Sequence, residues 1–350
     1  MGIYKAEIKD FFVLKSNLSL TFSTGVNVII GENGTGKTTL LKVIYMMCDF
    51  AKDRHNANHN DIESAIDEVN KRGWKSFTTA QFVNIEPYFP NIQHGKGIIT
   101  GFADDKGNIF DKNSQINLNF DYGKDSLTRV TIFGIHDECS AVLIPTNDML
   151  SHSKGLLALD RERQLPFDKT YIDILSKAQL PVTRDITHVA GSVIDKIKKI
   201  IGGEVVYEND IFYVVNDVGE KTPFNLEASG YRKFGLLWKL LRNGLLEAGG
   251  ILFWDEPENS LNPELVPVLV DILFLLSRQG VQVFLATHDY NIMKYFSVKK
   301  ISTDKVAFHS LQKTDNGIVW EREDDYDLLT NNSIVNADIQ MVKDEIGGDA

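Results

Sequence analysis

Cysteine is nearly absent from this sequence, which limits the kinds of protein it can be. Among its 350 residues only Cys48 and Cys139 are cysteines, and neither belongs to a Cys-x-x-Cys pair. This argues against a disulfide scaffold or a zinc site and fits a reducing compartment. The eight histidines are scattered and form no His-Glu-x-x-His motif, which argues against a zinc metalloprotease.

Long hydrophobic runs are also absent. The longest apolar stretch, residues 265–276, contains Asp271 and is too short to cross a bilayer. The first residues lead directly into a strand-like pattern without a signal peptide, and Ala6 breaks the myristoylation pattern. We therefore expect a soluble, cytoplasmic protein with no membrane partner.

An excess of positive charge is missing as well. The net charge is −11, and an acidic surface disfavours non-specific nucleic-acid binding because phosphate contacts need clustered Lys and Arg. A local basic patch is left open. The hydrophobic fraction of 43% and the charged fraction of 24% are ordinary for a globular protein, so a well-filled core is expected.

Strands and helices alternate in the predicted order of elements. Apolar runs predict strands over residues 3–14, 18–22, 26–30, 140–144, 250–254 and 281–286, and hairpins over 97–133, 205–215 and around 315–317. Helical spacing predicts helices over 37–47, 61–71, 231–248 and 263–278, and mainly helical structure over 151–202, followed at the C-terminus by a polar tail. Such alternation indicates a parallel sheet with right-handed crossovers.

A glycine-rich loop after the strand at 26–30 carries the strongest chemical motif. Residues 31–38, Gly-Glu-Asn-Gly-Thr-Gly-Lys-Thr, match Gly-x-x-x-x-Gly-Lys-Ser/Thr. Glycines let several backbone N–H groups point at one phosphate chain, and the helix that follows adds its N-terminal dipole. We expect Lys37 to reach the β- and γ-phosphates of ATP and Thr38 to ligate Mg²⁺. The alternative is a chance glycine loop, which the strand–loop–helix setting makes less plausible.

Two acids end the apolar strand at 250–254. Asp255 and Glu256 would lie in the crevice at the carboxyl edge of the sheet, beside Lys37. Asp255 would hold Mg²⁺, directly or through water, and Glu256 would polarise the water that attacks the γ-phosphate. A surface acidic pair after a core strand is the plain alternative, which becomes implausible in combination with the glycine loop.

Two weaker motifs take their meaning from position. His288 follows the strand at 281–286, predicted to neighbour the Asp255 strand, so we expect it near the γ-phosphate in a polarising role. Ser229 and Gly230 precede the helix at 231–248, where Ser229 is a good N-cap and Gly230 permits close backbone approach. Alone, each could be structural: a lone histidine usually is, and Ser-Gly is a common helix start.

Taken in order, these motifs resemble the ABC-type ATPase heads of the SMC and RecF proteins. Residues 31–39 look like Walker A, Asp255-Glu256 like Walker B, Ser229-Gly230 like the signature motif, residues 260–263 like the D-loop and His288 like the switch histidine. The closest resemblance is to short AAA-family ATPases grouped with OLD-family and phage-defence proteins, such as Septu-like and PARIS-like systems, carried mainly by residues 255–264. It covers most of residues 1–310.

The resemblance implies a fold, an organisation and a set of ATP contacts. The implied fold class is α/β, a P-loop NTPase of ABC-ATPase type with a mixed sheet, an antiparallel subdomain and a helical lobe. The expected regions are an ATPase lobe over 1–150, a helical insert and hairpin over 151–225, a second ATPase lobe over 226–310, and a C-terminal hairpin and tail over 311–350. The implied ATP contacts are Asn33, Gly34, Thr35, Gly36, Lys37, Thr38, Thr39, Ser229 and Gly230.

The sequence departs from the family pattern in three places. The signature segment is Ala-Ser-Gly-Tyr-Arg rather than Leu-Ser-Gly-Gly-Gln, which argues against a transporter subunit. No Q-loop glutamine follows the strand at 140–144, which ends in Pro145 and Thr146. No long coiled coil is inserted, and no nuclease module of the kind fused to OLD proteins is visible.

The family mechanism implies a switch. Two copies would sandwich ATP head to tail, as a homodimer or a higher oligomer, and hydrolysis would release them. We expect the output to be performed by a separate effector, a nuclease or toxin, in antiphage defence. The main alternative is a RecF-like DNA-repair ATPase that clamps duplex DNA. This alternative predicts that one face of the dimer gathers the basic residues Lys154, Arg161, Arg163, Lys196, Lys198 and Lys199. A nucleotide-binding scaffold with little turnover is a third alternative, against which Glu256 argues.

Overall fold

The computed structural model describes most of the chain. The described residues are 2–53, 79–89, 96–101, 115–121, 127–133, 140–163, 165, 167–183, 188–330 and 332–347. The helix predicted over 61–71 and the hairpin turns predicted around 104–107 and 122–124 lie outside these residues. No helix in the described part of the chain is long and apolar enough to cross a membrane.

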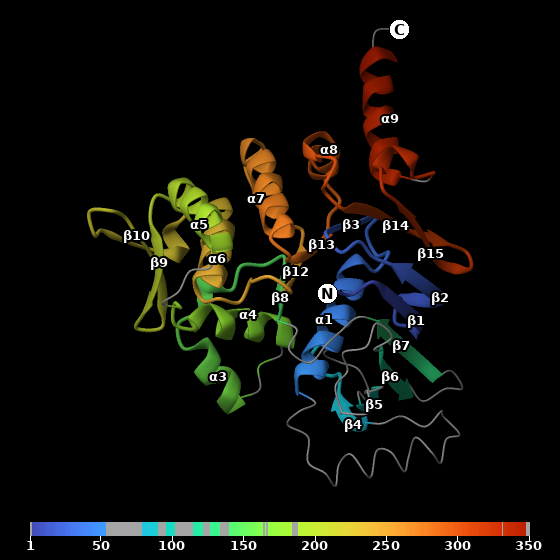
Figure 1. The fold of residues 1–350 in the computed structure, drawn as a ribbon, viewed down its shortest axis with the longest axis horizontal. Coiled ribbons are helices and arrows are strands. Elements are labelled where there is room, and N and C mark those ends of the chain that lie inside the picture. The colour runs from blue at the N-terminus through green and yellow to red at the C-terminus, as the bar shows by residue number, and fades with distance from the viewer. Residues whose placement is uncertain are drawn as a thin grey trace.

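A mixed sheet of six strands, in the order β15-β14-β3-β13-β12-β8, forms the centre of the described structure (Figure 1). Its strands are β3 (Val26–Gly31), β8 (Ala141–Ile144), β12 (Ile251–Asp255), β13 (Gln282–Ala286), β14 (Val306–Thr314) and β15 (Gly317–Glu323). All neighbouring pairs are parallel except β14 and β15, which form the predicted C-terminal hairpin. The carboxyl ends of β3, β8, β12 and β13 therefore lie at one edge.

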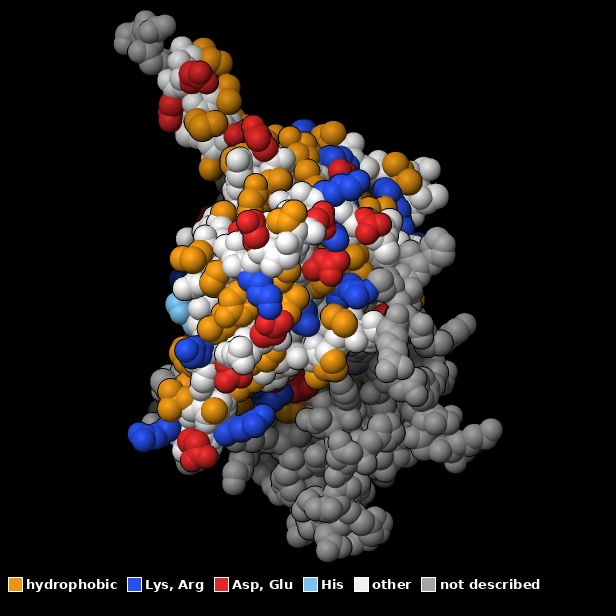
Figure 2. Space-filling model, turned by 90° about the vertical axis from the view of Figure 1, so that its left-hand side faces the viewer, with side chains coloured by type: hydrophobic (Ala, Val, Ile, Leu, Met, Phe, Trp, Pro, Cys, Tyr) orange, Lys and Arg blue, Asp and Glu red, His pale blue; other side chains and the backbone are white. Residues whose placement is uncertain are grey.

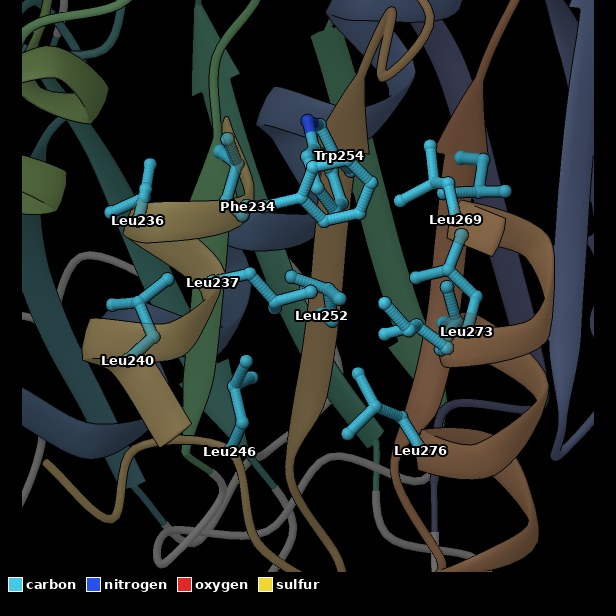
Figure 3. Packing of buried hydrophobic residues seen from close by; sticks show 14 of the residues in the cluster. Phe234, Leu236, Leu237, Leu240, Leu246, Leu252, Trp254, Leu269, Leu273 and Leu276 are labelled. Carbon is cyan, nitrogen blue, oxygen red and sulfur yellow. The ribbon is translucent and has the colours of Figure 1, made fainter. Parts of the chain in front are cut away.

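Both faces of β12 are buried, which explains its unbroken apolar sequence. Leu252 and Trp254 point toward α6 (Ser229–Arg242) and α7 (Val266–Arg278), where they pack with leucines of both helices (Figure 3). Phe253 points to the opposite face and stacks on Phe284 of β13 at 5.0 Å between ring centroids. This packing on two sides fixes the position at which Asp255 leaves the sheet.

The opposite face is covered by α1 (Lys37–Asp53) and by a second, antiparallel sheet in the order β2-β1-β7-β6-β5-β4. Its strands are β1 (Lys5–Phe11), β2 (Leu14–Thr21), β4 (Thr79–Asn84), β5 (Lys96–Gly101), β6 (Gln115–Asp121) and β7 (Leu127–Phe133). Strand β4 was not predicted. Helix α1 runs beyond the predicted end at residue 47 because Cys48 and Ala51 continue its buried side.

A helical lobe follows β8. It contains α3 (Leu156–Arg163), α4 (Lys169–Gln179), α5 (His188–Ile201), the short 3₁₀ helices η2 (Leu150–His152) and η3 (Phe224–Leu226), and a small sheet of β9 (Glu204–Glu208), β10 (Ile211–Val215) and β11 (Lys221–Pro223). The hairpin predicted around Asn209 and Asp210 is confirmed, and both residues have left-handed φ angles of 51° and 61°, which a tight turn of this kind requires.

Polar side chains join α4 to α1. Lys42 of α1 pairs with Asp168 at 2.5 Å, and Tyr45 donates a hydrogen bond to Asp173 at 2.9 Å. Lys169 pairs with Asp49 near the end of α1. Burial tends to lower the pKa of Lys169, but Asp173 and Asp49 outweigh it and raise that pKa. The contact between the two helices is thus held by directional charged bonds.

The C-terminal segment corrects one prediction. After η4 (Pro263–Leu265), α7, α8 (Tyr290–Lys299), the β14–β15 hairpin and η5 (Tyr326–Leu328), the chain forms α9 (Ser333–Gly347), where the sequence suggested only a polar tail. Asn332 is buried at the helix start, and its side chain accepts a hydrogen bond from the N–H of Val335, as an N-cap does. Figure 1 shows α9 projecting from the body, with the C-terminus at its far end.

Candidate functional site

The glycine loop lies between the end of β3 and the start of α1. Gly34 and Gly36 have φ angles of 80° and 93°, in the region that favours glycine. A Cβ atom at Gly36 would approach Val13 Cγ2 to 2.7 Å. The Thr35 hydroxyl donates to the Glu32 carbonyl at 2.9 Å, and Leu40 N–H donates to the Gly36 carbonyl at 2.8 Å. The loop therefore curls tightly and delivers the chain into a helix.

Lys37 lies against this loop and faces the acids of the site. Its Nζ donates hydrogen bonds to the Gly31 carbonyl at 2.8 Å and the Glu32 carbonyl at 3.0 Å. Burial lowers the pKa of Lys37, and the opposing charge of Glu256, Asp255 and Glu258 counteracts this. Asn33 and Gly34 are exposed at the loop tip, Thr35 is buried, and Thr39 is half-buried on α1.

Asp255, at the end of β12, gathers two hydroxyl groups. Thr38 Oγ1 lies 2.9 Å from Asp255 Oδ2, and Thr146 Oγ1 from the loop after β8 lies 2.9 Å from the same oxygen. Burial raises the pKa of Asp255, while the two hydroxyl hydrogen bonds act in the opposite direction. The structure thus brings Thr38 and Asp255 together as predicted, and adds Thr146, which the sequence analysis did not identify.

The donors around Asp255 fit Mg²⁺. They are a carboxylate and two hydroxyl oxygens, and Mg²⁺ prefers oxygen ligands with one or two carboxylates, completed by water and substrate phosphate oxygens. No group of three or more His, Cys, Asp or Glu side chains suited to a metal occurs in the described residues. The oxygen set is consistent with an ion shared between protein and substrate rather than one enclosed by protein alone.

Glu256 turns away from the sheet directly after Asp255. Its φ angle is 48°, a left-handed conformation that is uncommon outside glycine and concentrates at functional sites. Its N–H donates to the Ala286 carbonyl at 2.8 Å, which ties the turn to the end of β13. His288, after β13, places Nδ1 3.2 Å from Glu256 Oε1. The two predicted catalytic residues therefore lie side by side.

Glu258 supports the histidine loop from beneath. Its Oε1 accepts hydrogen bonds from Thr287 Oγ1 at 2.6 Å and from the His288 N–H at 3.3 Å. Burial raises the pKa of Glu258, and these hydrogen bonds oppose the increase. No motif in the sequence marks Glu258 for such a role.

The first turn of α6 contacts both loops that flank Asp255. Lys233 Nζ donates to the carbonyl of Glu256 at 2.9 Å and to that of Pro257 at 3.3 Å. Burial lowers the pKa of Lys233 to about 8. The neighbouring Arg232 pairs with Asp148, after β8, at 3.0 Å. Neither basic residue had been identified from the sequence.

Ser229 does not cap α6, so that prediction is wrong. Ala228 is the N-cap, because its carbonyl accepts the first helical hydrogen bond, from Arg232 N–H at 3.1 Å. Ser229 already lies within the helix, and its hydroxyl donates to the Ser260 carbonyl at 3.2 Å. A Cβ at Gly230 would lie 3.1 Å from Leu261 Cδ1. Within one copy, Ser229 and Gly230 thus pack on residues 260–261, and the Ser229 hydroxyl is not bonded to the glycine loop.

This sheet order, with a glycine loop, an acidic strand end and a histidine at one edge, defines an ABC-type ATPase head with a P-loop NTPase fold. The chain belongs to the AAA domain family, since a family model described as "AAA domain" matches residues 5–180. A second model, described as "AAA domain, putative AbiEii toxin, Type IV TA system", matches residues 143–294. The fold class and the family resemblance expected from the sequence are confirmed at this level.

Curated relatives match short segments only. The DNA replication and repair protein RecF of Limosilactobacillus fermentum is 44% identical over 45 residues, 13% of this chain and 12% of that protein. RecF of Oenococcus oeni is 39% identical over 62 residues, 18% of this chain and 16% of that protein. The chain therefore matches less than a fifth of either relative.

A solved structure shows the same fold over nearly the whole chain. The SmcHead bound to the C-winged helix domain of ScpA superposes with a TM-score of 0.52 and 14% identity, covering 92% of this chain and 98% of that chain. At this identity the likeness concerns the fold alone.

Proposed function

We propose that this ATPase-family chain binds ATP with Mg²⁺, hydrolyses it, and uses the cycle as a switch. Two copies close head to tail around ATP and control a separate effector, a nuclease or toxin, in antiphage defence. The observation that carries the hydrolytic part is the oxygen cluster of Thr38, Thr146 and Asp255, with Glu256 and His288 beside it.

Each residue of the site has a distinct role in this proposal. The loop amides and Lys37 bind the phosphates, while Thr38 and Asp255 hold Mg²⁺, which supplies positive charge where negative charge develops. Glu256 accepts a proton from the attacking water. His288, 3.2 Å from Glu256, orients that carboxylate and polarises the γ-phosphate. The remaining ATP contacts are Asn33, Gly34, Thr35, Gly36 and Thr39.

Closure requires the second copy to supply Ser229 and Gly230. Within one copy these residues pack on the loop at Ser260, while the start of α6 has backbone N–H groups suited to a phosphate. A γ-phosphate bound between two copies would link dimerisation to nucleotide binding.

Two observations support the proposed effector and the proposed role in defence. Resemblance to phage-defence ATPases suggests a nucleotide-controlled partner. The family model over residues 143–294 is described as a putative toxin of a type IV toxin–antitoxin system, which also points to work with a second gene product. The test is to express the chain with its genomic neighbours and challenge cells with phage. Protection should require both Lys37 and the neighbour, and protection that survives Lys37→Ala would refute the switch.

A RecF-like DNA clamp is the second candidate, favoured by the short RecF matches. The helical-lobe face gives it little support. Lys196 pairs with Asp271 at 3.5 Å, and Lys198 pairs with Glu204 at 2.9 Å. Figure 2 shows basic, acidic and apolar side chains interspersed on this face. Tight binding of duplex DNA at physiological salt, falling steeply with added salt, would favour the clamp over the effector switch.

A further inference from the structure

Helix α9 lies at the same edge of the molecule as the candidate nucleotide site. A groove of about 590 Å³ is lined on one side by Gly31, Asn33 and His288 and on the other by Ala337 and Met341 of α9. The helix is fixed at its base by the Asn332 cap and by Ile334, which packs against the main core. Whatever approaches the glycine loop from this side therefore also approaches α9.

Beyond its base, α9 has a row of exposed apolar side chains along one side. Ile339, Val342 and Ile346 are spaced i, i+3 and i+7, which places them along one face of a helix. They are 47%, 43% and 77% exposed, and Met341, on the side of the helix that lines the groove, is 61% exposed. Exposed apolar side chains are ordinary when single, but a continuous set marks a contact surface.

We infer that α9 is an arm that lies against a second copy of this chain when two copies close over ATP. This inference rests on the head-to-tail dimer proposed above. A second copy that brings its Ser229 to the glycine loop must enter the groove that α9 borders. The 15 residues of α9 extend about 22 Å, so the helix reaches past the loop along the incoming copy.

The surface that α9 meets is the segment around Ser229 of the second copy. Leu226 and Tyr231 flank this serine and are 73% and 39% exposed. Large apolar side chains beside a helix start are a suitable counterpart for Ile339 and Val342, which lie on one side of α9, because both surfaces lose water on contact.

The charges of α9 argue against a lipid surface as its occupant. The helix carries Asp338, Asp344 and Glu345 with one lysine, Lys343. Helices that lie on membranes are rich in Lys and Arg on the polar side. An acidic helix with an apolar stripe fits a protein surface instead.

The test measures dimer formation of the full-length chain by analytical ultracentrifugation with AMP-PNP and Mg²⁺. The combined variant Ile339→Ser, Val342→Ser and Ile346→Ser should raise the dimer Kd by about tenfold or more, because apolar burial is lost. AMP-PNP affinity of the separated copies should change less than about twofold. The matched control carries three serines on the polar side, at Asn336, Gln340 and Lys343, and should dimerise like the wild type.

Leu226→Ser tests the surface on the second copy. It should also weaken the dimer, and its effect should be less than additive with the α9 variant, as expected for groups in contact. Full additivity overturns the pairing with Leu226. A dimer Kd for the α9 variant that equals or falls below the wild-type value overturns the arm, and would leave an effector protein as the occupant of α9.

A further pair of measurements separates this inference from the dimer proposal. Ser229→Arg should abolish AMP-PNP-dependent association while α9 remains intact. If the wild type binds AMP-PNP but does not associate, the dimer proposal fails and the arm fails with it. If the wild type and the α9 variant associate equally and Ser229→Arg does not, only the arm fails.

Discussion

Lys233 donates a hydrogen bond of 2.9 Å to the backbone carbonyl of Glu256. The bond joins the N-terminal part of α6, the helix that begins with Ser229 and Gly230, to the turn that presents the proposed catalytic carboxylate. Because Glu256 holds a left-handed φ of 48°, its conformation depends on surrounding contacts of this kind. Within one copy, a single hydrogen bond from Lys233 thus connects the helix that begins with Ser229 and Gly230 to the turn at Glu256.

Glu256→Gln should slow ATP turnover by about a hundredfold or more, the range for loss of a positioned base. ATP affinity should persist, since this variant leaves the proposed phosphate contacts, Lys37 and the glycine loop, unchanged. Lys37→Ala should lose ATP binding itself. Steady-state phosphate release and a fluorescent nucleotide titration would measure both effects, and equal turnover by the wild type and Glu256→Gln would remove Glu256 from the mechanism.

Lys233→Met should lower kcat by about tenfold while the KM for ATP stays nearly constant, because a small displacement of a catalytic group is costly. The methionine keeps the volume of the side chain but cannot donate to the carbonyls of Glu256 and Pro257. Lys233→Arg should recover part of the activity. Lys313→Met, at an exposed lysine on β14, is the control and should behave like the wild type. If the lost activity matches a loss of folded protein and the kcat of the folded molecules is unchanged, Lys233 has no positioning role.

Thr146→Val should raise the Mg²⁺ concentration needed for half-maximal activity by about tenfold, the lower range for loss of a group that orients a ligating carboxylate. The valine removes the hydroxyl that lies 2.9 Å from Asp255 and keeps a similar shape. Thr146→Ser retains the hydroxyl and should need ordinary Mg²⁺ concentrations. An unchanged Mg²⁺ titration for the valine variant would show that Thr146 does not support the metal ligand.

His309 should make folding stability depend on pH. Its Nδ1 accepts from Trp320 Nε1 at 3.2 Å and its Nε2 lies 3.1 Å from Asn27 Oδ1, so the neutral ring is satisfied and a proton on Nδ1 would face another donor. Complete burial lowers the pKa of His309 to about 3. The unfolded chain takes up the proton near its ordinary pKa of about 6.5, so the effect of His309 on the free energy of unfolding is constant above that pH, and it lowers this free energy between about pH 6.5 and 3.

At pH 5 this loss should reach about 2 kcal/mol relative to pH 7. Urea unfolding of the wild type and of His309→Gln at both pH values would measure it. The variant should be less stable at pH 7 but should lose about 2 kcal/mol less on acidification. Parallel pH dependence of the two proteins would show that His309 is not the titrating group.

The strands of the central sheet and the motif residues at its edge can be predicted from the sequence. Strands β12 and β13 are unbroken apolar runs, since both of their faces are buried, and runs of this kind are visible without a structure. Asp255 follows such a run directly, and Thr38 follows the glycine loop after β3. Because the strands are parallel, both residues lie at the carboxyl edge of the sheet, where their side chains can form a hydrogen bond.

The residues that were missed depend on long-range contacts. Thr146 and Lys233 reach Asp255 and Glu256 across 109 and 23 positions of sequence, and a lone threonine or lysine carries no local sign of this. Helix α9 was missed because Asn336 and Asp338 interrupt its apolar spacing, and its start depends on a cap from Asn332. The four-region division of the chain stays a prediction.

The charged contact between α1 and α4 has a mechanical consequence. Ion pairs and hydrogen bonds with fixed partners are directional, so they resist a change in the relative position of the two helices. Helix α1 starts at Lys37, and Lys42 and Tyr45 bind it to Asp168 and Asp173, so we expect the two helices to move together. Phe167 and Leu180 are exposed at the two ends of α4, so we expect a movement of α1 that starts at the glycine loop to change the outer surface of the protein at these two side chains.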